Sequence, residues 1–394
     1  MFKSIDKIRL LLILLLFILL FKNISLIPLY DDESAHYGQI KLFYEGNYRV
    51  YENISVIPLY HLTLSWSAKI LKTDSVQILR TVSFIFSLFS IIIFYKLSSL
   101  LDFNNSVLKT AQFAFLPVFF PYRFLLYVEN LAVLLLLISL YFLFQKRFFF
   151  SSLFLLMTVA TKQIYIVWLP LFMLLPFIRG QTLNWKLCLR QNWLNFLTLL
   201  LFIIFMIANR GVAIGTQSAH PDFFLSLGNL YWALFLFFIL FLPLILKTMP
   251  QIFFSLKKYP GLILAALLFL TVSWFAFHSS HPWNQFPEHL RNLVLMSAKQ
   301  GIGKFLFLMA AILALLTLCF QSLLKRKYYI IYPLSIMSLA TIWLIESRYA
   351  LPAFTFFLLF RRTGNKIIEI LILCLFMIFS GYLYWGYLNQ LFYF

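Results

Sequence analysis

The sequence predicts an all-α integral membrane protein with about 13 transmembrane helices. Of its 394 residues, 62% are hydrophobic and only 11% are charged, which is more apolar surface than the interior of a soluble domain can hold. A bilayer accommodates that surface, and helices that cross it satisfy their own backbone hydrogen bonds. Apolar runs of roughly the length needed to cross a bilayer recur along the whole chain.

These apolar runs predict the individual spans. The first run follows Lys3, Lys7 and Arg9, as in a signal sequence, but no small-residue cleavage site comes after it. We therefore expect an uncleaved first helix that reaches about Pro28. The expected spans are approximately 9–28, 79–97, 110–126, 130–145, 148–161, 164–178, 193–209, 223–246, 260–277, 303–322, 328–345, 350–360 and 366–388.

The loops between the spans predict the orientation. If the N-terminus is cytoplasmic, the loops on that side carry the basic clusters, among them residues 325–327 and 361–362. Most acidic residues and all six His then fall in loops on the opposite side. This segregation follows the positive-inside rule, so the net charge of +19 indicates cytoplasmic anchoring and no nucleic-acid partner. A plainer explanation is that external loops simply need polar residues.

The first external loop, about residues 29 to 78, gathers scarce carboxylates. Asp31, Asp32 and Glu33 stand together there, although the chain has only 13 acidic residues. Two stretches of this loop, "SAHYGQIKLFYEGN" ended by Gly46 and "VIPLYHLTLSWSAKIL" with Pro58 near its start, predict helices lying on the membrane surface. We expect the acids at the mouth of a helix-lined cleft, in a single domain over 1–394.

The spacing of the polar residues after Pro28 predicts a shared helix face. Asp32, His36 and Gln39 are separated by four and three residues, which brings their side chains together on a helix. The alternative is that the acidic triplet only caps the helix and begins a solvated turn.

Cysteine and histidine patterns indicate neither a disulfide framework nor a metal centre. The three Cys lie in or beside apolar runs, and the spacing of His278, His281 and His289 fits no ligand motif. We expect no metal and no cofactor. Trp283 in the same loop suits stacking against a ligand or a place in an interfacial aromatic belt.

Five short segments resemble, in the same order, segments of the GT-C glycosyltransferases, which are polytopic enzymes that use polyprenyl-phosphate sugars. The likeness is greatest to the eukaryotic dolichyl-phosphate-glucose α-1,2-glucosyltransferase family, which adds the terminal glucose to the lipid-linked N-glycan precursor. In the third segment, Lys162 replaces an Arg and Tyr165 an Asn of the family's Arg-Gln-Thr-Asn motif. The segments are "YDDESAHYGQIKLFYEGN", "LLYVEN", "TKQIYIVW", "NRGVAIGTQSAH" and "IESRYALP".

The resemblance implies a GT-C-like helix bundle that transfers a hexose, glucose in the first instance, from a polyprenyl- or dolichyl-phosphate donor. The acceptor would be a hydroxyl of a lipid-linked oligosaccharide or another exoplasmic glycan. Because the donor already carries phosphate as a leaving group, one carboxylate acting as general base suffices for an inverting displacement. Asp32 is the first choice for that base and Glu33 the next. The resemblance and the charge of the side chains nominate as substrate-binding residues His36, Gln39, Glu129, Lys162, Gln163, His220, Arg348 and Tyr349.

Several of these residues also have purely structural explanations. In the first explanation, Lys162 is an interfacial lysine whose ammonium group extends to water. Glu129 pairs with Arg123 in another, and Arg348 pairs with Glu346 in a third. His220 would then be an ordinary loop histidine.

Two other functions compete with the enzyme. A transporter or flippase of lipid-linked sugars would place ionisable residues near the bilayer midplane and show related halves, and neither is evident. A membrane scaffold would not need ordered polar motifs on one side. We expect a multi-pass protein in contact with membrane lipid, with an exoplasmic active site. The bacterial cytoplasmic membrane is favoured, and the ER membrane applies if the source is eukaryotic.

Overall fold

The computed structural model describes residues 4–179, 182–183, 185–215 and 225–393. The described elements are helices, apart from two antiparallel strands of two residues each, which confirms the all-α class. The contacts of the chain group into two compact units. Unit 1 comprises residues 1–114 and 119–223, and unit 2 comprises residues 115–118 and 224–394. A single domain over 1–394 stays a prediction.

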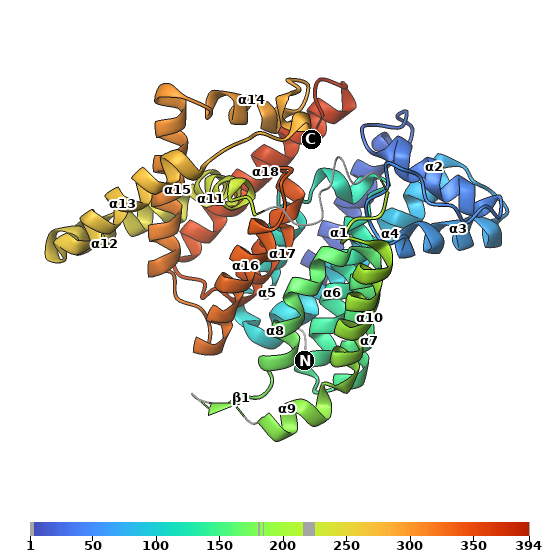
Figure 1. The fold of residues 1–394 in the computed structure, drawn as a ribbon, viewed down its shortest axis with the longest axis horizontal. Helices are drawn as coiled ribbons and strands as arrows, with labels where there is room; N and C mark the ends of the chain where they lie inside the picture. The colour runs from blue at the N-terminus through green and yellow to red at the C-terminus, as the bar shows by residue number, and fades with distance from the viewer. Residues whose placement is uncertain (1–3, 180–181, 184, 216–224, 394) are drawn as a thin grey trace. The chain divides into compact units, whose positions relative to one another are not determined.

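In unit 1, α4 packs against α6, α6 packs against α7, and α10 lies along α7 (Figure 1). Its elements are α1 (Ser4–Ile24), α2 (Glu33–Tyr44), α3 (Leu59–Leu71), α4 (Val76–Leu101), η1 (Phe103–Asn105), α5 (Ser106–Ala114), η2 (Pro121–Phe124), α6 (Glu129–Phe144), α7 (Phe148–Thr161), η3 (Gln163–Trp168), α8 (Leu169–Leu174), β1 (Ile178–Arg179), β2 (Thr182–Leu183), α9 (Trp185–Gln191) and α10 (Trp193–Asn209).

The two helices expected in the first loop are confirmed as α2 and α3. Gly46 follows the end of α2 with φ +85°, a conformation that glycine adopts without a steric penalty, and its N–H donates to Phe43 O at 3.2 Å. Pro58 occupies the N-cap position of α3. The position of both helices at the membrane surface stays a prediction.

A buried apolar core holds α2 and α3 on the longer helices of unit 1. Ile40 of α2 meets Tyr60 and Leu64 of α3, with Leu79 of α4 and Leu131 of α6 completing this part of the cluster. Tyr60 and Leu64 are four residues apart and therefore lie on one helix face. The polar residues of the first loop are thus mounted on packed helices.

In unit 2, α11, α12 and α13 each pack against α15 (Figure 1). Its elements are α11 (Gly228–Leu240), α12 (Leu242–Lys258), α13 (Pro260–Ala276), η4 (Pro282–Gln285), α14 (Leu290–Ser297), α15 (Gly301–Phe320), η5 (Arg326–Ile330), α16 (Ile331–Ala340), η6 (Ser347–Ala350), α17 (Leu351–Phe360) and α18 (Lys366–Leu388).

Three described helices, α4, α15 and α18, are long and apolar enough to cross a membrane. The number rises to five if the bent pairs α9–α10 and α11–α12 are each one span. The expectation of about 13 spans is not confirmed. Other expected spans correspond to shorter apolar helices such as α6, whose 16 residues extend about 24 Å at 1.5 Å per residue, less than the bilayer core of about 30 Å.

Two expected spans are wrong as continuous helices. The run 110–126 is interrupted because α5 ends at Ala114, and Pro117 and Pro121 cannot donate the backbone hydrogen bonds of a continuing α-helix. The run 223–246 is broken at Phe241, where α11 and α12 meet at an angle of 95°. Apolar length alone did not reveal either interruption.

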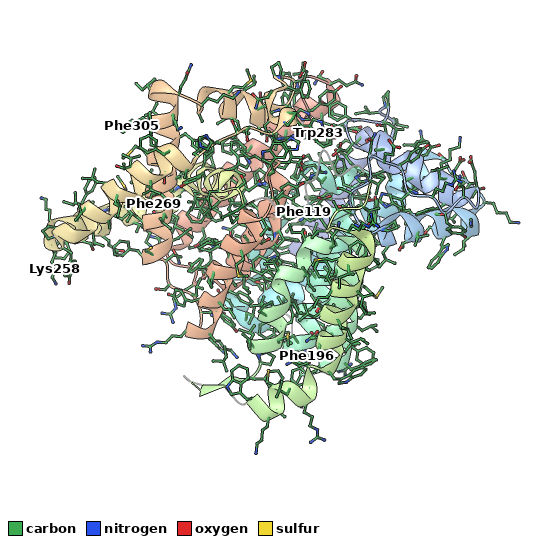
Figure 2. The ribbon with its side chains drawn as sticks, in the orientation of Figure 1. Phe119, Phe196, Lys258, Phe269, Trp283 and Phe305 are labelled. Carbon is green, nitrogen blue, oxygen red and sulfur yellow. The ribbon has the colours of Figure 1, made fainter. Side chains whose placement is uncertain are left out.

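Large apolar side chains point outward from several of these helices. Phe196 of α10 and Phe305 of α15, labelled in Figure 2, are 39% and 44% exposed. Exposed rings of this kind on long apolar helices are typical of lipid-facing surfaces and suit a membrane protein.

Candidate functional site

The acidic triplet lies at the start of α2. Asp31 has φ +55°, a left-handed conformation that is uncommon for residues other than glycine. Asp32 is the N-cap residue, yet its side chain makes no capping hydrogen bond. Capping therefore does not account for the Asp32 carboxylate. A residue held in a sparsely populated conformation beside it is a feature found at functional sites.

Glu33 is fully buried and forms an ion pair with Arg80 of α4. Its Oε1 accepts hydrogen bonds from Arg80 Nε at 3.0 Å and Leu126 N at 2.8 Å. Its Oε2 accepts from Arg80 Nη2 at 2.6 Å and Tyr30 N at 3.1 Å. All these contacts are to the protein itself, so this carboxylate anchors the start of α2 to the helices behind it.

Tyr127 connects Asp31 with His36. The Tyr127 hydroxyl donates to Asp31 Oδ2 at 3.5 Å, and its ring packs edge-on against the His36 ring with the centroids 5.5 Å apart. Tyr127 precedes α6 and is itself buried. One aromatic side chain thus joins the acidic triplet to the polar face of α2.

His36 forms a buried hydrogen bond with His61 of α3, which brings its Nδ1 within 2.9 Å of His61 Nε2. Burial, followed by the neighbouring His36 ring, holds the pKa of His61 well below its usual value. Burial raises the pKa of the adjacent Tyr60 hydroxyl, which contacts Ser83 Oγ at 3.0 Å. The predicted residue His36 therefore has a second histidine as its neighbour, and both rings rest against Tyr60.

The two glutamines predicted to bind substrate hold loop backbones in this structure. Gln39 Nε2 donates to Arg49 O at 3.0 Å, and its Oε1 accepts from Tyr51 N at 2.6 Å. Gln163 Nε2 donates to Ser55 O at 2.6 Å and to Val212 O at 2.9 Å. These amides order the loop between α2 and α3.

Glu129 and Lys162 form a buried ion pair, with Lys162 Nζ 2.5 Å from Glu129 Oε1. The structural explanation that paired Glu129 with Arg123 is wrong, because the Arg123 guanidinium instead donates to Ser87, Ser90 and Phe113 O. The snorkelling explanation of Lys162 is also wrong, because this residue is only 5% exposed. Both partners come from segments that the sequence nominated.

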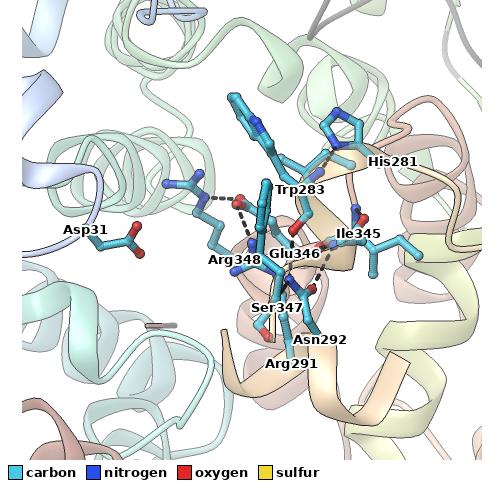
Figure 3. Close-up of polar contacts among 12 residues, drawn as sticks. Asp31, His281, Trp283, Arg291, Asn292, Ile345, Glu346, Ser347 and Arg348 are labelled. Atoms are coloured by element: carbon cyan, nitrogen blue, oxygen red, sulfur yellow. Dashed lines mark hydrogen bonds and ion pairs between the residues drawn. The ribbon is translucent and has the colours of Figure 1, made fainter. Parts of the chain in front are cut away.

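In unit 2, Glu346 lies between two arginines (Figure 3). Its Oε2 accepts from Arg348 Nε, and its Oε1 lies 3.5 Å from Arg291 Nη2. The structural explanation that paired Arg348 with Glu346 is thus confirmed, with Arg291 as an additional partner of Glu346. The nominated Tyr349 is half-buried, and its N–H donates to Glu346 O at 3.3 Å.

Buried asparagines fix the segment that carries Glu346 (Figure 3). Asn284 accepts from Ile345 N at 3.0 Å and donates to Ile345 O at 2.9 Å. Asn292 donates to Trp283 O at 2.7 Å, and Asn229 accepts from Glu346 N at 3.0 Å. These bonds hold the charged cluster on a rigid backbone, and the Trp283 ring beside it is 42% exposed.

Sequence reasoning missed Arg291 and His61 as site residues. Arg291 stands in the loop whose histidines drew attention to metal binding, and its pairing with Glu346 connects residues far apart in sequence. The available signal was the position of His61 next to Tyr60 in a mostly apolar stretch. Within the described ranges, no three His, Cys, Asp or Glu side chains gather as a metal site. His220 lies outside the described residues.

Residues 27–183 match the model of the DIE2/ALG10 family. ALG10 is a dolichyl-phosphate-glucose α-1,2-glucosyltransferase, so the resemblance is confirmed for this part of the chain. The match covers less than half of the chain: it includes the acidic triplet and Lys162 and ends before Arg348. Among curated proteins and among solved structures, nothing matches the chain.

Proposed function

We propose, with the match of residues 27–183 to the DIE2/ALG10 family as the premise, that the chain is a membrane glycosyltransferase. It transfers a hexose, glucose in the first instance, from a polyprenyl- or dolichyl-phosphate donor to a hydroxyl of a lipid-linked oligosaccharide or another exoplasmic glycan. The observation that carries the proposal is the acidic triplet in the matched part, where the buried ion pair of Glu33 with Arg80 fixes the start of α2 and with it the position of Asp32.

Asp32 is the general base in this proposal. Its carboxylate takes the proton of the acceptor hydroxyl as that oxygen attacks the anomeric carbon, and the lipid phosphate leaves with the bonding electron pair. One carboxylate is enough, because phosphate needs no protonation to depart. Glu33, although also nominated for catalysis, has the role of anchoring the loop, since its oxygens are occupied by Arg80 and two backbone N–H groups.

The donor phosphate is assigned to guanidinium groups in unit 2. Arg348 and Arg291 both contact Glu346, and an arginine fork matches the geometry of phosphate oxygens. Lys162 in unit 1 is a second cationic candidate, although its charge is already balanced by Glu129. His36 and Tyr349 are retained as substrate-binding candidates.

A transfer assay with purified protein tests the proposed function. We expect labelled glucose to move from a synthetic polyprenyl-phosphate donor to a lipid-linked oligosaccharide, with the product identified by mass spectrometry. UDP-glucose should not serve as the donor, and EDTA should not abolish activity. The Asp32→Asn variant is the matched negative control. Transfer from UDP-glucose that needs added manganese would refute the proposal.

The proposed setting is a multi-pass protein whose acidic triplet faces the exoplasmic side, in the bacterial cytoplasmic membrane or the ER membrane. Single cysteines introduced at exposed Asn47 and exposed Arg326, in a background without the three native cysteines, should report opposite sides. An impermeant reagent should label position 47 from the exoplasmic side only. Labelling of both positions from the same side would contradict this orientation.

A further inference from the structure

Two buried histidines from different helices meet next to the acidic triplet. The His36 and His61 rings are 7% and 0% exposed, and their nitrogens Nδ1 and Nε2 lie 2.9 Å apart. Tyr60 packs edge-on against both rings, and Tyr127 packs edge-on against His36. The pair is therefore a fixed element of unit 1, and its member His61 has no role yet in the proposed function.

The ring nitrogen of His61 that does not face His36, Nδ1, indicates which histidine donates the shared proton. This Nδ1 is buried and has no hydrogen-bond partner within the described part of the chain. Buried N–H donors that lack an acceptor are rarer than unsatisfied acceptors. The arrangement of lower cost leaves Nδ1 of His61 without a proton, so its Nε2–H donates to His36 Nδ1. The neutral His36 ring then carries its own proton on Nε2.

Building on the proposed function, we propose that His61 is a positioning residue that holds neutral His36 with its proton on Nε2, so that His36 offers the sugar-phosphate substrate an uncharged N–H donor. An uncharged donor suits a site in which a neighbouring carboxylate acts as a base. A cationic imidazolium in the same place would favour the ionised carboxylate and weaken it as a base.

Aromatic rings and acidic groups surround the pair, and Asp32 begins the helix turn that carries His36. Tyr60 and Tyr127 face His36, and Asp31 reaches it through the Tyr127 hydroxyl. Of the nearby charged groups, Glu33 is paired with Arg80, and Glu129 is paired with Lys162. Burial holds the pKa of His61 well below its usual value, which keeps that ring neutral at neutral pH.

Deuterium exchange at the imidazole C2 carbon tests the proposal without substrate. Measured by mass spectrometry on the full chain in detergent at a series of pH values, its rate gives the pKa of each histidine. His61→Leu removes the donor to neutral His36, so the pKa of His36 should rise by about one unit, a tenfold gain in proton affinity. His61→Gln can place an amide N–H near the former Nε2–H and should restore the wild-type value.

Hexose transfer gives the second readout. In His61→Leu the turnover should fall about tenfold. This is less than the loss of about 10² to 10³ that follows removal of a hydrogen-bond donor to the transition state. The loss should become larger as the pH is lowered. His61→Gln should recover most of the turnover. Ser65→Ala, a buried change one turn along the same helix, is the matched control and should leave both readouts unchanged.

An unchanged or lowered pKa of His36 in His61→Leu would overturn the proposal. If that variant does not fold, His61→Phe keeps a ring without the donor, and the same outcomes apply. Because exchange requires no donor sugar, it decides the role of His61 even if wild-type protein fails to transfer hexose. That failure would overturn the proposed function instead.

Discussion

The Arg80 guanidinium and the Glu33 carboxylate form a two-contact ion pair in which both side chains are fully buried. Arg80 also donates to Ile27 O at 2.5 Å and to Pro28 O at 3.0 Å, so it binds the chain just before the acidic triplet as well as the triplet itself. Arg80 of α4 therefore fixes the position of the segment that joins α1 to α2.

Replacing Glu33 with Gln should destabilise the protein strongly. The change leaves the Arg80 charge buried without its partner, and breaking a buried pair in this way typically costs about 3–5 kcal/mol. Denaturant unfolding in detergent measures the loss. Glu45→Gln, at an exposed position on the same loop, is the control and should stay within about 0.5 kcal/mol of wild type. Equal stability of the two variants would contradict the anchoring role.

Replacing Asp32 with Asn should lower turnover by about 10² to 10⁴, the usual contribution of a general base, with donor binding retained. Asp31→Asn is the matched control, because Asn tolerates the left-handed conformation at position 31 as well as Asp does. It should lose much less activity. Steady-state transfer rates of the two variants measure the difference. Full activity in Asp32→Asn would show that Asp32 is not the general base.

The Glu129–Lys162 pair should show strong coupling in a double-mutant cycle. Lys162→Met alone leaves a buried carboxylate without its cation and should cost about 3–5 kcal/mol of stability. Adding Glu129→Gln removes that charge and should restore most of the loss, because both partners of the pair are then neutral. Unfolding free energies of the four proteins give the coupling. Additive losses would mean that the two groups do not depend on each other.

The arginine cluster of unit 2 should affect donor affinity more than turnover. Arg291→Lys keeps the charge but loses the planar fork, so the KM for the polyprenyl-phosphate donor should rise about tenfold, equivalent to roughly 1.4 kcal/mol. The kcat should change little. Arg326→Lys, an exposed arginine in the same unit, provides the control. A wild-type KM in Arg291→Lys would argue against phosphate binding by this cluster.

His61 should make the stability of the protein depend on pH. Its pKa in the folded protein lies well below the unfolded value of about 6.5, so the unfolded state binds more protons at acid pH. The stabilisation is complete above about pH 6.5 and is lost as the pH falls through the folded pKa. Apparent unfolding temperatures between pH 7.5 and 5.5 should fall less steeply in His61→Gln than in wild type. His278→Gln, at an exposed position, should keep the wild-type slope.

The parts of the fold that sequence reasoning predicted well are those with local signals. Gly46 and Pro58 bound α2 and α3 because their backbone preferences act at single positions, whatever the rest of the chain does. The expected span 193–209 coincides with α10 for the same reason, since an uninterrupted apolar run is a local property. Pro117 and Pro121 were visible too, but the length of their apolar run was given more weight.

Long-range pairs were beyond the reach of sequence reasoning. Arg80 was counted as part of a span, yet it lies 47 residues from Glu33 and meets it only after α4 has packed against the first loop. His36 and His61 are 25 residues apart, on two helices whose relative register no motif fixes. The resemblance nominated Glu33 and His36. Their partners became known only from the packing of the helices.

The right-angled junction at Phe241 governs the sidedness of everything that follows it. Two helices that meet at 95° cannot both run along one bilayer normal. As a broken span, the segment from Gly228 to Lys258 counts as one crossing, whereas as a re-entrant loop it counts as none. The difference reverses the parity of crossings, and with it the compartment predicted for each later segment, including α14 with Arg291. The 95° angle fits both readings, so labelling of sites before Gly228 and after Lys258 decides the number of crossings at this junction.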